Sequence, residues 1–198
     1  FVDALSSYQS DFAVLPEFFN APLMGLTDQS QQMNAIRFLA GFTERFKREM
    51  SQMAVSYNVN IITGSMPLQE GESIYNVSYL CRRDGSVEEQ RKLHITPHEK
   101  RDWVIEGGDD VRVFDTDAGR VGILICYDVE FPELSRLLAD QVVDHVARDV
   151  DAHLVEPDPD LHLLPPRAHH RARVAPVFAL LHAAVPLERG GGEDDEEL

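Results

Sequence analysis

Short apolar runs alternate with amphipathic segments along the first 140 residues, and this alternation constrains the fold more than any other feature of the sequence. An apolar run of roughly 4–8 residues that ends at a turn is typical of a buried strand. Apolar side chains three and four positions apart over 30–57 predict one long amphipathic helix. Strands are expected at 12–15, 60–64, 73–81, 87–93, 111–114 and 121–126, with a further helix over 130–139. Such alternation predicts a layered α/β domain.

The composition changes abruptly after residue 140, so we divide the chain into a partial α/β domain, 1–140, and an atypical acidic tail, 141–198. The tail is rich in His, Pro and Ala, and it lacks Ser, Thr, Asn, Ile, Lys, Tyr, Met, Trp and Cys. Six of the eight histidines lie in it: His145, His153, His162, His169, His170 and His182.

Three interpretations of the tail stay open. Clustered histidines suggest a metal site, but their spacing matches no recognised set of ligands, so we expect no metal. The second interpretation is a low-complexity tail without stable structure. The third is DNA read in a shifted frame or across a retained intron, and we prefer this hypothesis because nine residue types disappear together. The apolar stretches of the tail do not repeat the rhythm of strands and helices, so we expect no continuation of the domain there.

The net charge of −16 argues against nucleic acid or an anionic membrane surface as a partner, because both need a basic surface. No apolar run approaches the ~18–20 residues that cross a bilayer. Two cysteines without a secretory signal favour reduced thiols and a cytoplasmic location. Because the chain begins at Phe1, in what resembles the end of a helix, we interpret it as N-terminally incomplete.

Three segments place a reactive side chain at the end of an expected strand. Glu17 follows the first strand, Lys92 lies near the end of the fourth and is followed by Glu99, and Cys126 ends the sixth. Active-site groups of α/β sheets usually lie at such strand ends. Each residue also has a plain structural interpretation: a solvated glutamate, a surface lysine, and a buried structural cysteine.

The segment around Cys126 is the most informative of the three. An apolar strand runs directly into the cysteine, a short polar turn follows, and a helix is expected to begin near Pro132. This arrangement predicts a nucleophile elbow, in which the thiol projects from a tight turn. Backbone N–H groups near the start of the helix can then face a developing oxyanion.

Taken in order, Pro16-Glu17, Arg91-Lys92 and the run Gly-Ile-Leu-Ile-Cys-Tyr-Asp at 122–128 resemble the Glu–Lys–Cys triad of the nitrilase (carbon-nitrogen hydrolase) superfamily. The resemblance extends from about Asp11 to Asp140. It implies the α-β-β-α sandwich of that family, truncated at the N-terminus and incomplete at the C-terminus. The residues at 94–108 also resemble bacterial members that are fused to an acetyltransferase domain.

The resemblance implies a role for each site residue. Cys126 would be the nucleophile, Glu17 the general base, and Lys92 would stabilise the tetrahedral intermediate together with the backbone N–H of Tyr127. Glu99 would help to position these groups. The implied reaction needs no metal or cofactor, and its substrate would be a small amide rather than a nitrile. Family members commonly associate through a helix–helix face, which implies a homo-oligomer for an intact member.

Two hypotheses about function therefore remain. The first is a cysteine-dependent hydrolase of non-peptide carbon–nitrogen bonds, acting through a thioester. The second is a product without catalysis, either an inactive fragment or an acidic, His-rich interaction protein that retains the hydrolase scaffold. Loss of activity on Cys126→Ala would support the first, and metal binding by the isolated residues 141–198 would favour an interaction role.

Overall fold

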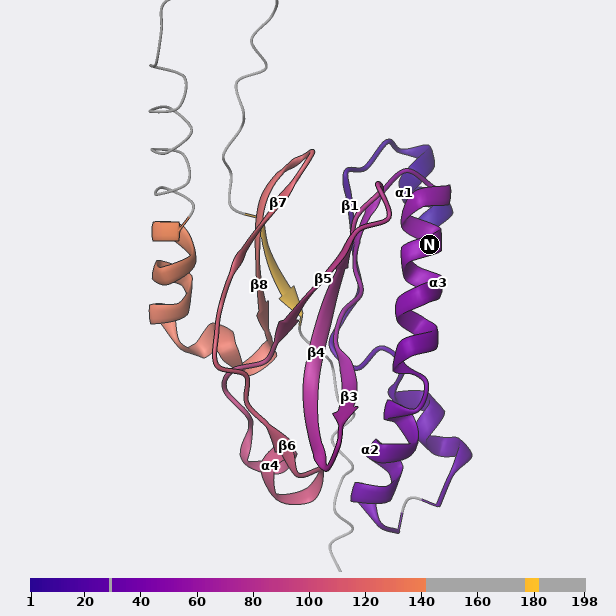
Figure 1. Ribbon diagram of the computed structural model, residues 1–198, viewed down its shortest axis with the longest axis vertical. Helices are drawn as coiled ribbons and strands as arrows, with labels where there is room; N and C mark the ends of the chain where they lie inside the picture. The colour runs from indigo at the N-terminus through magenta and orange to yellow at the C-terminus, as the bar shows by residue number, and fades with distance from the viewer. Residues whose placement is uncertain (29, 142–176, 182–198) are drawn as a thin grey trace, which may run out of the picture.

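The computed structural model describes residues 1–28, 30–141 and 177–181, and its strands form two sheets (Figure 1). In the larger sheet β1 (Phe12–Val14), β2 (Asn60–Ile62), β4 (Ser73–Cys81) and β3 (Met66–Glu70) are neighbours in that order, and β5 (Val87–Arg91) and β6 (Ile105–Glu106) also pair with β4. The smaller sheet has the order β7 (Val113–Thr116), β8 (Gly119–Ile125), β9 (Val177–Leu181). β1 and β2 are parallel, whereas β4 is antiparallel to β2, β3 and β5.

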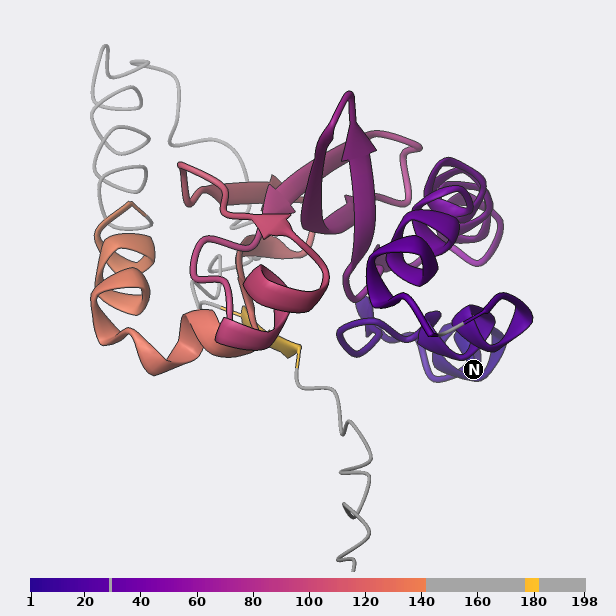
Figure 2. The same cartoon turned by 90° about the horizontal axis from the view of Figure 1, so that it is seen from below.

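Helices lie on the outside of both sheets, so the layers follow the order helix, sheet, sheet, helix (Figures 1 and 2). The larger sheet is covered by α1 (Val2–Ser7), η1 (Ala21–Leu26), α2 (Gln32–Ala40) and α3 (Thr43–Ser56). A helical segment at 132–141 lies on the outer face of the smaller sheet. This arrangement confirms the expected α/β sandwich.

The alternation of side chains along β8 explains why the layers stack in this way. Val121, Ile123 and Ile125 point into the core between the two sheets, where they pack against Ile62 and Leu80. The intervening Leu124 packs outward with Leu134 and Leu138 of the segment 132–141. Successive residues of a strand face opposite sides. Residues 121–125 of β8 carry no polar side chain, so this part of the strand must be covered on both faces.

The prediction of one long helix over 30–57 was wrong in one respect. Two helices occupy this stretch, because the chain turns at Gly41-Phe42. Gly41 N donates to Phe38 O (3.2 Å) and Phe42 N donates to Leu39 O (3.0 Å), so the last turn of α2 tightens to i→i−3 bonds. Phe42 O then accepts from Phe46 N, which begins α3 in a new direction. The apolar periodicity continues through the turn, and this is why it conceals the break.

The expectation that the tail contributes nothing to the domain was also wrong at one place. β9 pairs in parallel with β8, from Val121 opposite Val177 to Ile125 opposite Leu181. β8 therefore has a neighbour on each side, with β7 antiparallel on the other. The remainder of the tail, residues 142–176 and 182–198, lies outside the described residues and contains all six histidines of the tail. Within the described part, no group of three or more His, Cys, Asp or Glu could hold a metal ion.

No helix in the described part of the chain is long and apolar enough to cross a membrane.

Gly64 holds the strand end that carries Glu17, and we expect Gly64→Ala to be strongly destabilising. Its φ is +72°, and an added Cβ would lie 2.1 Å from Pro16 O, a backbone atom that cannot move away alone. Left-handed strain costs roughly 1–2 kcal/mol for a residue with a side chain, and the clash adds to it. We expect a loss of about 3 kcal/mol or more in urea unfolding.

Gly85→Ala is the matched control for this substitution. Gly85 has a φ of +89°, but the atom nearest to an added Cβ is Val55 Cγ2, at an ordinary 3.6 Å. This variant therefore measures the strain without the clash, and it should lose about 1–2 kcal/mol. Equal losses in the two variants would contradict a tight contact between Gly64 and the backbone at Pro16.

Candidate active site

Three of the predicted site residues meet in one buried cluster. Lys92 Nζ lies 2.9 Å from Glu17 Oε1 and 2.8 Å from Glu99 Oε2. All three side chains are buried, and that of Lys92 is only 1% exposed. Glu17 lies beyond β1, Lys92 follows β5, and Glu99 lies in α4 (Pro97–Asp102). Residues far apart in the sequence thus form a single charged group inside the protein, and the interpretation of Lys92 as a surface lysine is wrong.

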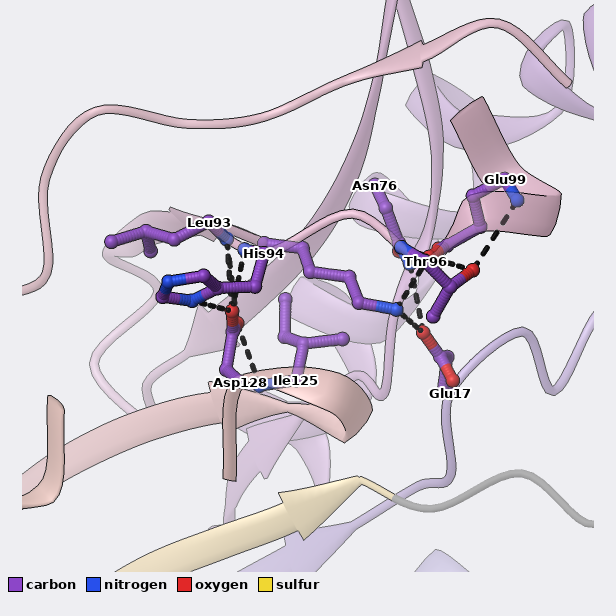
Figure 3. A network of polar contacts seen from close by, with 9 residues as sticks. Glu17, Asn76, Leu93, His94, Thr96, Glu99, Ile125 and Asp128 are labelled. Atoms are coloured by element: carbon purple, nitrogen blue, oxygen red, sulfur yellow. Dashed lines mark hydrogen bonds and ion pairs between the residues drawn. The ribbon is translucent and has the colours of Figure 1, made fainter. Parts of the chain in front are cut away.

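Two further polar residues complete the cluster, and neither was predicted. Asn76 Nδ2 donates to Glu17 Oε1 (2.9 Å) and to Glu99 Oε1 (3.0 Å), and so joins the two carboxylates (Figure 3). Thr96 donates to Glu99 Oε2 from both its backbone N and its hydroxyl, at 2.9 and 2.8 Å. Thr96 and Glu99 form a capping box at the start of α4. The Thr-x-x-Glu spacing is a signal in the sequence for the start of this helix.

The charges in the cluster favour the protonated form of Lys92. Burial alone would lower the pKa of Lys92, but the nearby charges of Glu17 and Glu99, with their hydrogen bonds, raise it above its ordinary value. An ammonium group in a site with little solvent is expensive unless it is paired and hydrogen-bonded. The two carboxylates meet that requirement, so the lysine is a fixed positive charge.

Cys126 lies at the end of β8, where η2 (Cys126–Glu130) begins. Its φ is 47°, a left-handed conformation that is uncommon for a residue with a side chain. The strand, the strained residue and the helical turn form the expected elbow. The thiol is half-buried. Burial and the charge of Glu17 raise the pKa of this thiol to about 11, and Lys92 opposes them.

Tyr127 and residues 93–95, which follow Lys92 in the chain, line a hollow of about 590 Å³. Its wall combines apolar side chains, among them Phe131 and Ile105, with charged side chains such as Lys100 and Glu106. The Tyr127 ring meets Phe131 edge to face, with the ring centroids 5.3 Å apart. The proposed role of the Tyr127 backbone N–H toward an oxyanion stays a prediction.

Buried groups that ionise in alkali should make the fold sensitive to high pH. Burial raises the pKa of the Cys81 thiol from 9.0 to about 12, and burial also raises the pKa of Tyr79. In the unfolded chain both groups lose their protons at their ordinary, lower pKa values. The unfolded state then binds fewer protons than the native state, and stability falls as pH rises. Lys92 acts in the same direction: its stabilisation is complete below about 10.5 and is lost as pH rises through its raised folded pKa.

We therefore expect the urea midpoint to fall continuously from about pH 9 upward. Cys81 alone should remove roughly 1.4 kcal/mol per pH unit between about 9 and 12. Urea titrations at several pH values between 8 and 11 measure this slope. Cys81→Ala should flatten it, and a constant midpoint would contradict the assignment.

The chain belongs to the carbon-nitrogen hydrolase family, whose family model matches residues 1–173. A Bacillus subtilis (strain 168) protein described as "Probable hydrolase YhcX" is 50% identical over 141 residues, a match that covers 71% of this chain and 28% of that protein. "Omega-amidase, chloroplastic" of Arabidopsis thaliana is 30% identical over 149 residues, covering 70% of this chain and 39% of the relative. The chain thus spans well under half the length of these two relatives.

Solved structures show the same fold. The carbon-nitrogen hydrolase from Helicobacter pylori G27 matches with a TM-score of 0.59 at 22% identity, over 70% of this chain and 47% of the other. Nit3 of Saccharomyces cerevisiae, described as a member of branch 10 of the nitrilase superfamily, matches with a TM-score of 0.51 at 26% identity, over 69% of this chain and 50% of the other. The predicted superfamily and α/β fold are confirmed. The catalytic roles, the division at residue 140, the amide partner, the cytoplasmic location and the resemblance to acetyltransferase-fused members stay predictions.

Proposed function

We propose that the protein hydrolyses the carbon–nitrogen bond of a small amide through a thioester on Cys126. One observation carries this proposal: the Glu17 carboxylate accepts a hydrogen bond from the buried Lys92 ammonium group, and burial, together with the charge of this carboxylate, raises the pKa of the Cys126 thiol at the end of β8. Family membership and the amidase names of several relatives support the same reaction class. A carboxylate that acts as the base, together with a cation and a thiol nucleophile, provides the groups that acyl transfer needs.

The raised pKa of Cys126 requires a base at the moment of attack. With a pKa of about 11, the thiolate fraction at pH 7 is on the order of 10⁻⁴. Glu17 therefore takes the thiol proton as Sγ attacks the carbonyl carbon. The C–S bond forms, and the π electron pair moves to the carbonyl oxygen. Lys92, whose charge is fixed by its carboxylates, and the N–H of Tyr127 stabilise that oxyanion.

The same carboxyl group serves the remaining steps. As the tetrahedral intermediate collapses, the C–N bond breaks, and protonated Glu17 gives its proton to the leaving nitrogen. Ammonia or an amine departs and leaves a thioester on Cys126. Glu17 then takes a proton from water, the resulting hydroxide attacks the thioester, and the C–S bond breaks. The proton returns to sulfur and a carboxylic acid is released, with no step that passes through a metal or cofactor.

A panel of small amides and the matching nitriles tests the reaction class. Ammonia release and the acid product are measured for each pair of compounds with the same acyl group. We expect turnover of amides and little or none of nitriles. Turnover of the nitriles alone would contradict the amide assignment. Absence of turnover for every compound, in folded protein, would favour the non-catalytic hypothesis.

A further inference from the structure

Asp128 is a buried carboxylate in η2 to which the proposed reaction assigns no role. Only 1% of its side chain is exposed, and it lies two residues beyond Cys126. Its Oδ2 accepts a hydrogen bond from Ile125 N, at 3.2 Å. The carboxylate therefore folds back onto the strand end that precedes the cysteine.

The other contacts of Asp128 reach a different part of the chain (Figure 3). Oδ1 accepts from His94 N at 2.8 Å and from Leu93 N at 3.2 Å, and Oδ2 lies 3.4 Å from Leu93 N. His94 Nδ1 also lies 3.2 Å from Oδ1. The His94 ring is stacked on Phe131, with the ring centroids 3.5 Å apart and an interplanar angle of 10°. Leu93 and His94 directly follow Lys92.

One side chain thus joins the two halves of the candidate site. Lys92 and the residues after it continue from β5 of the larger sheet, whereas Ile125 ends β8 of the smaller sheet and Cys126 follows it. Backbone N–H groups from both places donate to the same carboxylate. Such charge-assisted hydrogen bonds are roughly twice as strong as neutral ones, and burial strengthens them further.

We infer that Asp128 is a positioning residue that holds the chain at Lys92 in register with the chain at Cys126. This inference rests on the proposed function, because the register matters only if the cation and the thiol work on one substrate. A carboxylate suits the position since it has acceptors only. An amide would turn an NH₂ group toward one set of N–H donors, so Asn keeps the shape but can hold only one of the two segments.

Alkylation of Cys126 by iodoacetamide tests this inference without any amide turnover. The rate is measured across pH 7–10 for the unsubstituted chain and for Asp128→Asn, with peptide mass spectrometry to separate Cys126 from the buried Cys81. Lys92 lowers the pKa of the Cys126 thiol. If the lysine loses its register, the reactive thiolate becomes scarcer. We expect about a tenfold lower rate at pH 8 and a profile displaced to higher pH.

The sign of the change separates positioning from mere structural support. A residue that only stabilises the fold would, when replaced, loosen the protein and make the thiol react faster. Asp115→Asn is the matched control, because this exposed carboxylate on β7 pairs with Arg120 away from the cysteine. It should alkylate at the unsubstituted rate. An unchanged or faster rate in folded Asp128→Asn overturns the inference, whatever the chain does with amides.

If Asp128→Asn does not fold, amide hydrogen exchange in the unsubstituted protein decides the matter. One carboxylate holds the N–H groups of Leu93, His94 and Ile125, so all three should be protected and should exchange at a common rate. Rates for Ile125 and for the other two that differ more than about tenfold would overturn the inference, because the two segments would then open independently.

Discussion

Cys126→Ala should abolish amide hydrolysis, with a fall in kcat on the order of 10⁴-fold or more. The substitution removes the atom that would form the thioester, and no neighbouring group in the described cluster can replace it as a nucleophile of comparable reactivity. The fold should persist, because the thiol is only half-buried at the end of β8. Product formation and the urea midpoint, measured on the same preparation, separate loss of chemistry from loss of structure.

Cys81→Ala is the control for this experiment. Cys81 is fully buried in the core between α3 and the larger sheet. Its replacement should cost stability of about 1 kcal/mol, through lost packing, and leave kcat unchanged. Hydrolysis that survives Cys126→Ala, or that disappears equally in Cys81→Ala, would contradict the assignment of the nucleophile.

Lys92→Met should cause the largest loss of stability among substitutions in the site. It leaves Glu17 and Glu99 buried near each other without the cation that pairs with both. Removing one partner of a buried ion pair typically costs about 3–5 kcal/mol. The rate of amide hydrolysis should fall at least about 10²–10³-fold, as it does on removal of one oxyanion donor.

Lys47→Met provides the comparison with a lysine that is only partly buried, with 30% of its side chain exposed. Lys47 pairs with Glu44 of α3 at 2.7 Å, and its Nζ lies 5.2 Å from the centroid of the Tyr79 ring. Ion pairs that water can reach contribute about 0–1 kcal/mol. Urea unfolding of both variants should therefore show a clear difference. Similar losses for Lys92→Met and Lys47→Met would mean that the charge cluster is hydrated in solution.

Local patterns in the sequence predicted the parts of the fold that depend on neighbouring residues. The apolar run before Cys126 indicated both β8 and the elbow, and the structure has both. The order of Glu17, Lys92 and Cys126 indicated the family. In each case burial and strand periodicity act over a few residues, so they leave a trace in the sequence.

Long-range pairings left no such trace. Asn76 looks like an ordinary strand residue, and only the meeting of β4 with the two carboxylates makes it part of the site. β6 is too short to be recognised from its pattern, and it is identified by its pairing with Ile74 and Tyr75 of β4. β9 lies in a segment of biased composition, and its strand is defined by β8 beside it. These features depend on partners distant in the sequence.

The left-handed backbone at Cys126 has a consequence for how such a sequence evolves. A residue with a side chain pays roughly 1–3 kcal/mol to remain in this conformation, whereas glycine adopts it freely. If Cys126 is the nucleophile, selection for catalysis opposes that replacement. In a lineage that no longer uses the reaction, the strain would remain while the advantage of the thiol disappears. Glycine at this position, together with drift at Glu17 and Lys92, would then mark descendants that have become pseudoenzymes.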